Sequence, residues 1–362
     1  MDPTTIPPPR LADEKSKRTK TYPLFYSSYL HMGAVLFRLL VRAVSPGTGK
    51  LFDKWVTVDT PGLGEGKVQC ALCFPRSSGE QAVGDRNGDS KATLPLPLLL
   101  VADGGGFISG QPKDGEKGDR LLADKTNCIV LAVEYAKSPT YPFPHALLQL
   151  FTVLKWCLSP AAAAQGIAVD PSRIAVMGNS AGANLVTALS LLLSFRSGDC
   201  AAFRSELPPS FRMCLQVLLY PNVEGNLPYS ARYKRASKEV QQASLPIWLV
   251  EMMEGSYTPP YVDKEQIFTA PLNADVSLLR RLELPEAVVV TAGLDALKEE
   301  GEKYAAKLKE AGVKVVFMEF AEASHGFTVF SETNKGYRKE DVDGCWELVA
   351  GEVARVFGES LS

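Results

Sequence analysis

Ser180 lies in a sequence context that suits a catalytic nucleophile. The residues Gly178-Asn179-Ser180-Ala181-Gly182 follow an apolar run at 173–177 and precede a segment, 183–195, whose apolar residues have helical spacing. A strand, a Gly-x-Ser-x-Gly turn and a helix together hold the serine hydroxyl clear of the chain in a sharp, strained bend. The alternative is an ordinary strand-to-helix turn in which the serine caps the helix.

An acid and a base that could activate this serine follow two later strands. Asp295 comes directly after the apolar run 288–294, and His325 follows the apolar run 315–320. A serine hydroxyl is a poor nucleophile until a base removes its proton. We predict that His325 is this base, and then the acid for the leaving group, and that Asp295 fixes the imidazole tautomer.

The other histidines and the nearby carboxylates have simpler interpretations. The chain has 3 histidines, of which His31 lies in an N-terminal helical segment and His145 opens a predicted core helix. Two glutamates, Glu299 and Glu300, come soon after the predicted acid, but their place in a predicted helix favours surface charge. The acid and base named above therefore remain the best partners for the serine.

Glycines after another strand could donate hydrogen bonds to the oxyanion that forms when a serine attacks a carbonyl. Gly104-Gly105-Gly106 follows the apolar run 96–101, which we expect beside the strand that leads to the serine. Because glycine has no Cβ atom, its amide can turn toward a reacting group. The N–H groups of Gly104, Gly105 and Ala181 are the predicted oxyanion hole, and a flexible turn is the alternative.

Strands that alternate with helices must position these residues. Apolar runs such as 128–133 and 213–220 are typical of buried parallel strands, and helical patterns separate them. This alternation predicts an α/β fold with a doubly wound, mostly parallel sheet. Two further strands are expected at 55–58 and 68–74, and a solvated, mobile loop is expected at 77–93.

Composition argues against several classes of function. The 362 residues are 46% hydrophobic, carry a net charge of −2 and contain no long basic block, so nucleic acid is not an expected partner. Cys70-x-x-Cys73 lacks a second pair, and the sequence has no dinucleotide fingerprint or phosphate loop, so we expect no metal and no cofactor. The 7 cysteines lie mostly in apolar runs, and the first ten residues do not resemble a signal peptide, which predicts a cytoplasmic protein with reduced thiols.

The segment 24–41 is the most apolar early part of the chain. Ser27, Ser28, His31 and Arg38 interrupt it. A membrane span needs a more continuous apolar stretch, so we predict an amphipathic helix that packs on the protein itself. Contact of this helix with a membrane surface is the less favoured alternative.

Four motifs, in this order, resemble the hormone-sensitive-lipase-like branch of the α/β-hydrolases, which includes many carboxylesterases. The resemblance covers residues 101–327. Asp103-Gly104-Gly105-Gly106 corresponds to the family's His-Gly-Gly-Gly, and the segment around Ser180 corresponds to its Gly-Asp-Ser-Ala-Gly. Gly293-Leu294-Asp295-Ala296-Leu297 looks like the family's acid motif, with alanine where proline is usual, and His325-Gly326-Phe327 is its His-Gly-Phe.

The resemblance implies an α/β-hydrolase fold with a helical cap over the site. On this basis residues 1–20 are a disordered N-terminus, 21–50 form N-terminal cap helices, 222–275 form a cap insertion, and 51–221 with 276–362 form the core. Four cap residues are predicted to line the acyl pocket: Phe25, Tyr26, Trp248 and Met252.

Two residues depart from the family pattern and point to a specialised substrate. Asp103 replaces the family's histidine, and Asn179 replaces its aspartate. Both are predicted to belong to the substrate-binding region. A carboxylate beside an oxyanion hole would oppose the charge that develops there, so we expect Asp103 to turn away and to accept hydrogen bonds from loop amides or a cation.

These features predict a carboxylic-ester hydrolase that forms an acyl-serine on a small to medium, largely apolar ester, with specialised metabolites among the candidate substrates. The alternative is an acyltransferase or cyclase, in which a substrate nucleophile replaces water at the same three residues. A remote alternative is a small-molecule binding protein, as in the plant gibberellin receptor, which resembles this branch but lacks the histidine found here at His325. We expect a monomer or homodimer without a membrane span.

Overall fold

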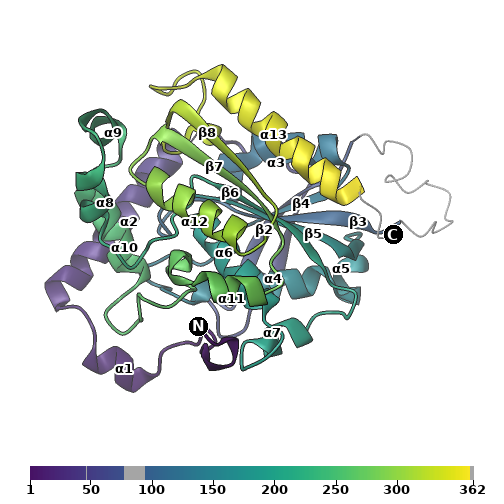
Figure 1. Ribbon diagram of the computed structural model, residues 1–362, viewed down its shortest axis with the longest axis horizontal. Helices are drawn as coiled ribbons and strands as arrows, with labels where there is room; N and C mark the ends of the chain where they lie inside the picture. Colours follow the sequence, from purple (N-terminus) through teal and green to yellow (C-terminus); the bar gives the residue numbers. More distant parts are fainter. Residues whose placement is uncertain (46, 77–93, 359–362) are drawn as a thin grey trace.

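An eight-stranded sheet forms the centre of the protein, in the order β1-β2-β4-β3-β5-β6-β7-β8 (Figure 1). The structure is a computed structural model that describes residues 1–45, 47–76 and 94–358. The strands are β1 (Lys54–Asp59), β2 (Lys67–Cys73), β3 (Leu96–Ala102), β4 (Ile129–Val133), β5 (Val169–Asn179), β6 (Met213–Leu219), β7 (Glu286–Leu294) and β8 (Val315–Ser324). The pairs β1–β2 and β2–β4 are antiparallel, and all the other pairs are parallel. The predicted mostly parallel sheet is therefore confirmed.

Helices cover both faces of this sheet, which explains why its central strands are continuously apolar. On one face lie α4 (His145–Cys157), α6 (Ala181–Ser194) and α12 (Lys298–Glu310), and on the other lie α3 (Pro112–Thr126) and α13 (Lys339–Gly358) (Figure 1). Alternate residues of β3 enter the two separate apolar cores, so both kinds of position are buried. The shorter segments are α5 (Pro160–Ala163), α7 (Ala201–Ser205), α11 (Val276–Arg281), η2 (Pro271–Asn273) and η3 (Phe327–Val329).

Four helices lie beyond the carboxyl ends of the strands, and we call them the cap. They are α2 (Leu24–Val44), α8 (Tyr229–Arg235), α9 (Lys238–Ala243) and α10 (Ile247–Tyr257), at the left of Figure 1. Helices α2 and α10 pack together through a small apolar cluster that contains Leu30, Ala34 and Met252. By length and composition one stretch of the described residues, Leu24–Ala43, could cross a membrane, and 11% of it is buried in the protein.

A buried ion cluster joins the cap to the core. Arg232 on α8 pairs with Glu254 on α10 and with Glu300 on α12, where the Nη1 to Oε2 distance is 2.7 Å. Glu300 also accepts the backbone N–H of Val223. The prediction that Glu300 is a surface charge was wrong, because its carboxylate is buried against Arg232, whereas Glu299 does pair with an exposed lysine one turn later.

The first twenty residues, for which disorder was predicted, are described by the structure and contain short helical turns; their disorder in solution stays a prediction. They contain η1 (Pro3–Thr5) and α1 (Glu14–Thr19). Asp2 and Asp13 cap these turns by accepting backbone N–H groups, and Cys200 donates its thiol to the carbonyl of Ile6. These local contacts oppose the entropy cost of ordering the segment. The predicted loop at 77–93 lies outside the described residues.

Candidate active site

Ser180 occupies a strained turn between β5, which ends at Asn179, and α6, which begins at Ala181. Its backbone angles are φ 54° and ψ −119°, a region that residues with a side chain rarely adopt. The turn is possible because of its glycines. A Cβ atom on Gly182 would lie 1.9 Å from the carbonyl oxygen of Ala102 on β3. The sequence therefore folds here into the sharp bend expected of a nucleophile.

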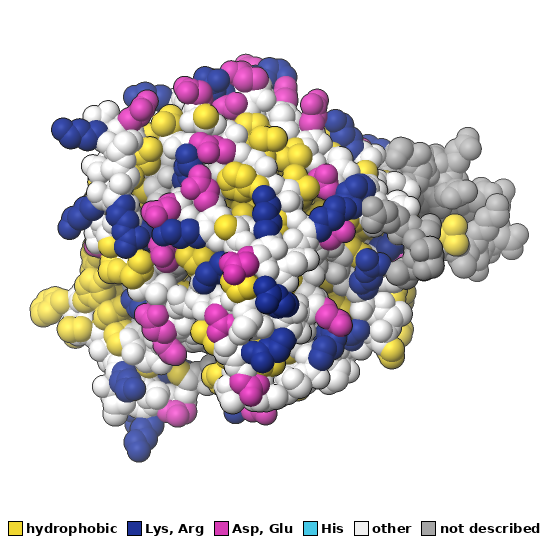
Figure 2. All heavy atoms as spheres, viewed as in Figure 1, with side chains coloured by type: hydrophobic (Ala, Val, Ile, Leu, Met, Phe, Trp, Pro, Cys, Tyr) yellow, Lys and Arg dark blue, Asp and Glu magenta, His cyan; other side chains and the backbone are white. Residues whose placement is uncertain are grey.

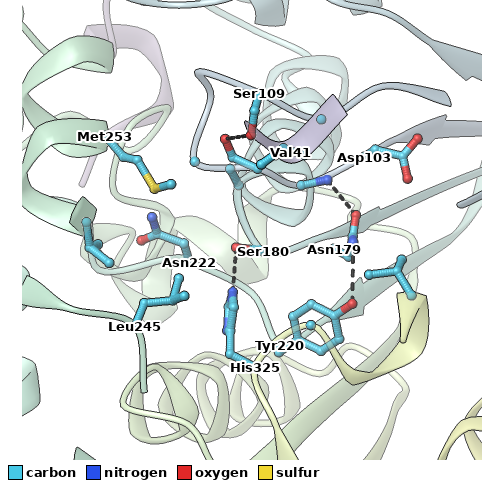
Figure 3. A pocket seen from close by; sticks show the side chains of 18 of the residues that line it. Val41, Asp103, Ser109, Asn179, Ser180, Tyr220, Asn222, Leu245, Met253 and His325 are labelled. Atoms are coloured by element: carbon cyan, nitrogen blue, oxygen red, sulfur yellow. Dashed lines mark hydrogen bonds between the residues drawn. The ribbon is translucent and has the colours of Figure 1, made fainter. Parts of the chain in front are cut away.

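A continuous hydrogen-bond chain runs from Ser180 to a buried carboxylate. The distance from Ser180 Oγ to His325 Nε2 is 2.9 Å, and that from His325 Nδ1 to Asp295 Oδ2 is 2.6 Å (Figure 3 shows the first of these bonds). The three side chains follow β5, β8 and β7, whose parallel packing brings their carboxyl ends to one edge. Asp295 is held in turn by the backbone N–H of Leu297. The arrangement can take a proton from the serine hydroxyl and stabilise the resulting imidazolium.

The pKa of His325 is set by two opposing effects. Burial lowers the pKa, but the Asp295 carboxylate and, less strongly, the Glu300 carboxylate together more than offset this, so the pKa lies above its ordinary value of 6.5. The ring of Tyr220 packs against the imidazole with its centroid 5.1 Å away. His325 is therefore a base whose protonated form is stabilised within a closely packed site. His145, by contrast, accepts the backbone N–H of Gly64 and has a structural role, as predicted.

The glycine loop after β3 leaves a different set of amide N–H groups unpaired from the set that the sequence predicted. The N–H of Gly104 donates to Asn179 Oδ1 at 2.6 Å (Figure 3), so Gly104 cannot serve as an oxyanion donor while this bond persists. Within the described part of the chain, the N–H groups of Gly105, Gly106 and Ala181 donate to no protein acceptor. Gly105 and Gly106 have φ of 104° and 60°, which turns their amides in a way that other residues would resist.

Asn179 positions the glycine loop and also lines the cavity at Ser180, so its place among the residues that bind substrate stays a prediction. Its amide oxygen accepts from Gly104, and its Nδ2 donates to the hydroxyl of Tyr220 at 3.3 Å. Sequence reasoning placed Asn179 beside the nucleophile but had no signal for its partner, because that partner lies 75 residues earlier in the chain.

We expect Asn179→Ala to lower kcat by about tenfold with a smaller change in KM, because the loop donors act mainly on the transition state. Asn179→Asp should retain most of the activity, since it keeps an acceptor for the Gly104 N–H, and the Tyr220 hydroxyl can rotate to donate to it. Steady-state kinetics of both variants on one soluble ester would check this. Equal losses in the two variants would contradict the positioning role.

Asp103 turns away from the catalytic serine, toward α3 (Figure 3). A Cβ atom on Gly115 of α3 would lie 2.8 Å from Asp103 Oδ1, and Asp103 Oδ2 has no hydrogen-bond partner among the described residues. The expected orientation away from the hole is found, but the expected amide or cation partner for this oxygen is not. Asp103 lines the cavity at Ser180 and, with Asp119, also borders a second, small cavity of ≈ 10 Å³.

Burial raises the pKa of Asp103 well above its ordinary value, and the neighbouring Asp119 raises it further. The pKa of Asp119 is itself raised to about 8, first by burial and then by Glu116. A protonated Asp103 carries no charge that could oppose an oxyanion. The raised pKa favours the neutral form of Asp103, and this form would oppose an oxyanion less than a carboxylate would, although Lys137 acts in the opposite direction on this pKa.

We expect Asp103→Asn to change kcat by less than about threefold, because the neutral amide replaces a neutral acid. An acid that keeps its proton when folded but loses it when unfolded makes folding less favourable as the pH rises above 3.8. The variant should therefore gain thermal stability over wild type as the pH rises from about 4 toward neutrality. Each kcal/mol gained in the free energy of unfolding should raise the melting temperature by roughly 2–4 °C. Melting curves across this range would check the prediction, with Asp119→Asn as a control that should shift in the same direction. A gain that shrinks with rising pH would contradict it.

A cavity of ≈ 350 Å³ opens above Ser180 and is enclosed largely by apolar side chains. Helix α2 contributes Phe37 and Val41, and α10 contributes Val250 and Met253. The loop after β8 and the residue Leu245 complete the wall. Glu254 also borders the cavity, and burial raises its pKa to about 7.

The four predicted cap contacts do not line this cavity, although the predicted helices do. Phe25 and Tyr26 lie about three turns before Phe37 on α2, and Phe25 is 91% exposed. Trp248 is 61% exposed. Met252 is buried, but its side chain points at Gly33 on α2, while the next residue, Met253, faces the cavity. A step of one residue rotates a helical side chain by about 100°, and the sequence did not define that rotation.

Comparisons with known proteins show which family the chain belongs to. A sequence model described as the alpha/beta hydrolase fold matches residues 99–329. An arylesterase of Saccharolobus solfataricus is 28% identical over 239 residues, which cover 66% of this chain and 70% of that protein. The carboxylesterase NlhH of Mycobacterium tuberculosis is 30% identical over 243 residues, which cover 65% and 68%.

A solved structure gives the same result over a larger share of the chain. The crystal structure of EstE1, a thermophilic carboxylesterase from a metagenomic library, has a TM-score of 0.64 and 28% identity, and the alignment covers 93% of this chain and 98% of EstE1. The sequence match alone spans more than half of the chain and contains the serine, the acid and the histidine. The chain therefore belongs to the α/β-hydrolase family, within its hormone-sensitive-lipase-like branch of ester-hydrolysing serine enzymes.

Proposed function

We propose that this chain hydrolyses carboxylic esters through an acyl intermediate on Ser180. The observation that carries the proposal is the chain of hydrogen bonds from Ser180 Oγ through His325 to the buried Asp295, at the base of an apolar cavity. His325 Nε2 takes the hydroxyl proton as Ser180 Oγ attacks the ester carbonyl. Asp295 holds Nδ1 protonated and stabilises the imidazolium that forms.

The tetrahedral intermediate places a negative charge on the former carbonyl oxygen. We assign its stabilisation to the N–H groups of Gly105, Gly106 and Ala181, which have no acceptor among the described residues. His325 then gives its proton to the leaving alcohol, and the acyl group stays on Ser180. Water enters, loses a proton to His325 and attacks the acyl-serine, which releases the acid and restores the serine hydroxyl.

The cavity supports a small to medium, largely apolar ester as the substrate. Its volume of ≈ 350 Å³ lies at the small end of ligand pockets in proteins. Phe37, Val41, Val250 and Met253 would exclude water from the acyl chain, and burial of that chain contributes about 25 cal/mol per Å² of apolar surface. Glu254 is a polar group at the cavity wall that could discriminate among alcohols with a hydrogen-bond donor.

Intact-protein mass spectrometry after brief exposure to activated acetyl, butyryl and octanoyl esters tests the proposal. We expect a mass increase equal to the acyl group, with peptide mapping that places it on Ser180, and no increase in Ser180→Ala. The relative yields rank the acyl groups that the cavity accepts. An adduct that persists in Ser180→Ala, or no adduct and no turnover with any of the three esters, would overturn the proposal.

A further inference from the structure

The side of α2 that faces away from the cavity is largely apolar, and it is exposed within the part of the chain that the structure describes. Leu30 and Ala34 pack inward and are buried, whereas Met32 is 65% exposed and Leu36 is 63% exposed. We define the outer face of α2 by its exposed apolar residues: Leu24, Phe25, Met32, Val35, Leu36, Leu39 and Leu40. Trp248 on α10, which packs beside α2, is also exposed. Soluble monomers rarely expose a contiguous apolar surface of this extent without using it.

The segment that contains α2 is basic in sequence, although three of its cations, Arg10, Lys17 and Arg42, pair with carboxylates. Residues 10–44 contain seven Lys and Arg but two Asp and Glu, whereas the whole chain carries a net charge of −2. Helix α2 itself contains no acidic residue. Figure 2 shows hydrophobic side chains gathered at the left edge, where Figure 1 places α2 and α10, with Lys and Arg side chains above and below them. An apolar strip bordered by cations is complementary to an anionic lipid surface.

Contacts with the core hold helix α2 in place. It can therefore lie on a membrane, but it could not cross one without losing the contacts that form the wall of the cavity. Arg38 Nε donates to the carbonyl of Ile108 at 2.9 Å, at the end of the glycine loop. Phe37 and Val41 on the inner side form part of the cavity wall. Leu245 both lines the cavity and is partly exposed, and it lies three residues before the exposed Trp248.

We propose that the outer face of α2, together with Trp248, docks on the surface of anionic phospholipid membranes. A second copy of the chain fits less well, because two such faces would bring excess positive charge together. The docked orientation places the mouth of the cavity at the lipid surface, from which an apolar ester would enter. This delivery of substrate rests on the proposed esterase function, whereas the docking itself does not.

Vesicle flotation with purified full-length protein tests the docking. We expect binding to vesicles of phosphatidylcholine with phosphatidylglycerol, and much weaker binding to phosphatidylcholine alone. Leu36→Asp should lower the bound fraction at least tenfold, because it introduces a charge into the middle of the apolar strip, and Trp248→Ser should lower it severalfold. Trp55→Ser is the matched control, since Trp55 is exposed on β1, outside the cap, and its loss should leave binding unchanged.

The measurements separate the docking from the chemistry. Leu36→Asp should retain wild-type turnover of a water-soluble ester, which shows that the fold and the site remain intact, and Ser180→Ala should float with anionic vesicles as wild type does. If vesicle binding persists while no ester acylates the protein, the docking stands and the proposed function fails. Wild-type binding by Leu36→Asp, or equal binding to neutral vesicles, would overturn the docking on anionic lipid. The docking would also be overturned if the wild-type protein were a homodimer that does not bind vesicles and if Leu36→Asp made it monomeric.

Discussion

Ser180→Ala should reduce kcat for ester hydrolysis by about 10⁶-fold, as expected when the nucleophile of such a triad is removed. No other hydroxyl among the described residues lies within hydrogen-bond distance of His325. The remaining donors, on Gly105, Gly106 and Ala181, would still bind an oxyanion, so a residual rate about 10³–10⁴-fold above that of the uncatalysed reaction is expected. Stopped assays with a chromogenic ester would measure the loss.

The same variant should keep its fold, which separates loss of chemistry from loss of structure. Alanine retains the Cβ atom and has the same backbone preferences as serine to a first approximation, so the strained turn at φ 54° should persist. Circular dichroism and a melting curve close to those of wild type would confirm this. Activity within tenfold of wild type in a folded Ser180→Ala protein would contradict the assignment of the nucleophile.

The parallel sheet could be predicted from local patterns. The same patterns predicted that the serine, the acid and the histidine follow strands in that order along the chain. A strand buried on both faces is continuously apolar, and this property marked β3, β5, β6 and β7 in the sequence. The beginning of helix α3 at Pro112 has no comparable signal in the sequence. Its first turns are polar and contain two glycines, and their helicity depends on a capping box and on the approach of Trp346 to Gly118.

The finer features of the site could not be predicted because they depend on contacts between distant segments. The donor to Asn179 is the Gly104 N–H on another strand's loop, and the amides that remain for an oxyanion are turned by the positive φ of Gly105 and Gly106. The burial of Glu300 depends on Arg232, which a helix of the cap brings to it. Composition indicated which segments form the cap, but the side of each helix that faces the cavity is decided by tertiary packing.

Asp295→Asn should lower kcat by about 10⁴-fold, because the amide can stabilise the wrong imidazole tautomer and provides no charge for the imidazolium. The structure leaves no equivalent carboxylate in place. Glu300 is already paired with Arg232, and Glu299 lies on the surface beside a lysine. Glu299→Gln is therefore the matched control and should leave kcat unchanged. A loss below about tenfold in Asp295→Asn would show that another group orients the histidine.

The pH dependence of the same variant tests the electrostatic part of this argument separately. Ester hydrolysis requires neutral His325, so wild-type kcat/KM should fall as the pH drops through the pKa of His325, which the Asp295 carboxylate holds above 6.5. Removing that negative charge leaves burial as the dominant effect, and burial lowers the pKa. The acid limb of the profile should therefore move to lower pH in Asp295→Asn while the plateau falls. An acid limb that stays in place would mean that His325 owes its raised pKa to a charge other than that of Asp295.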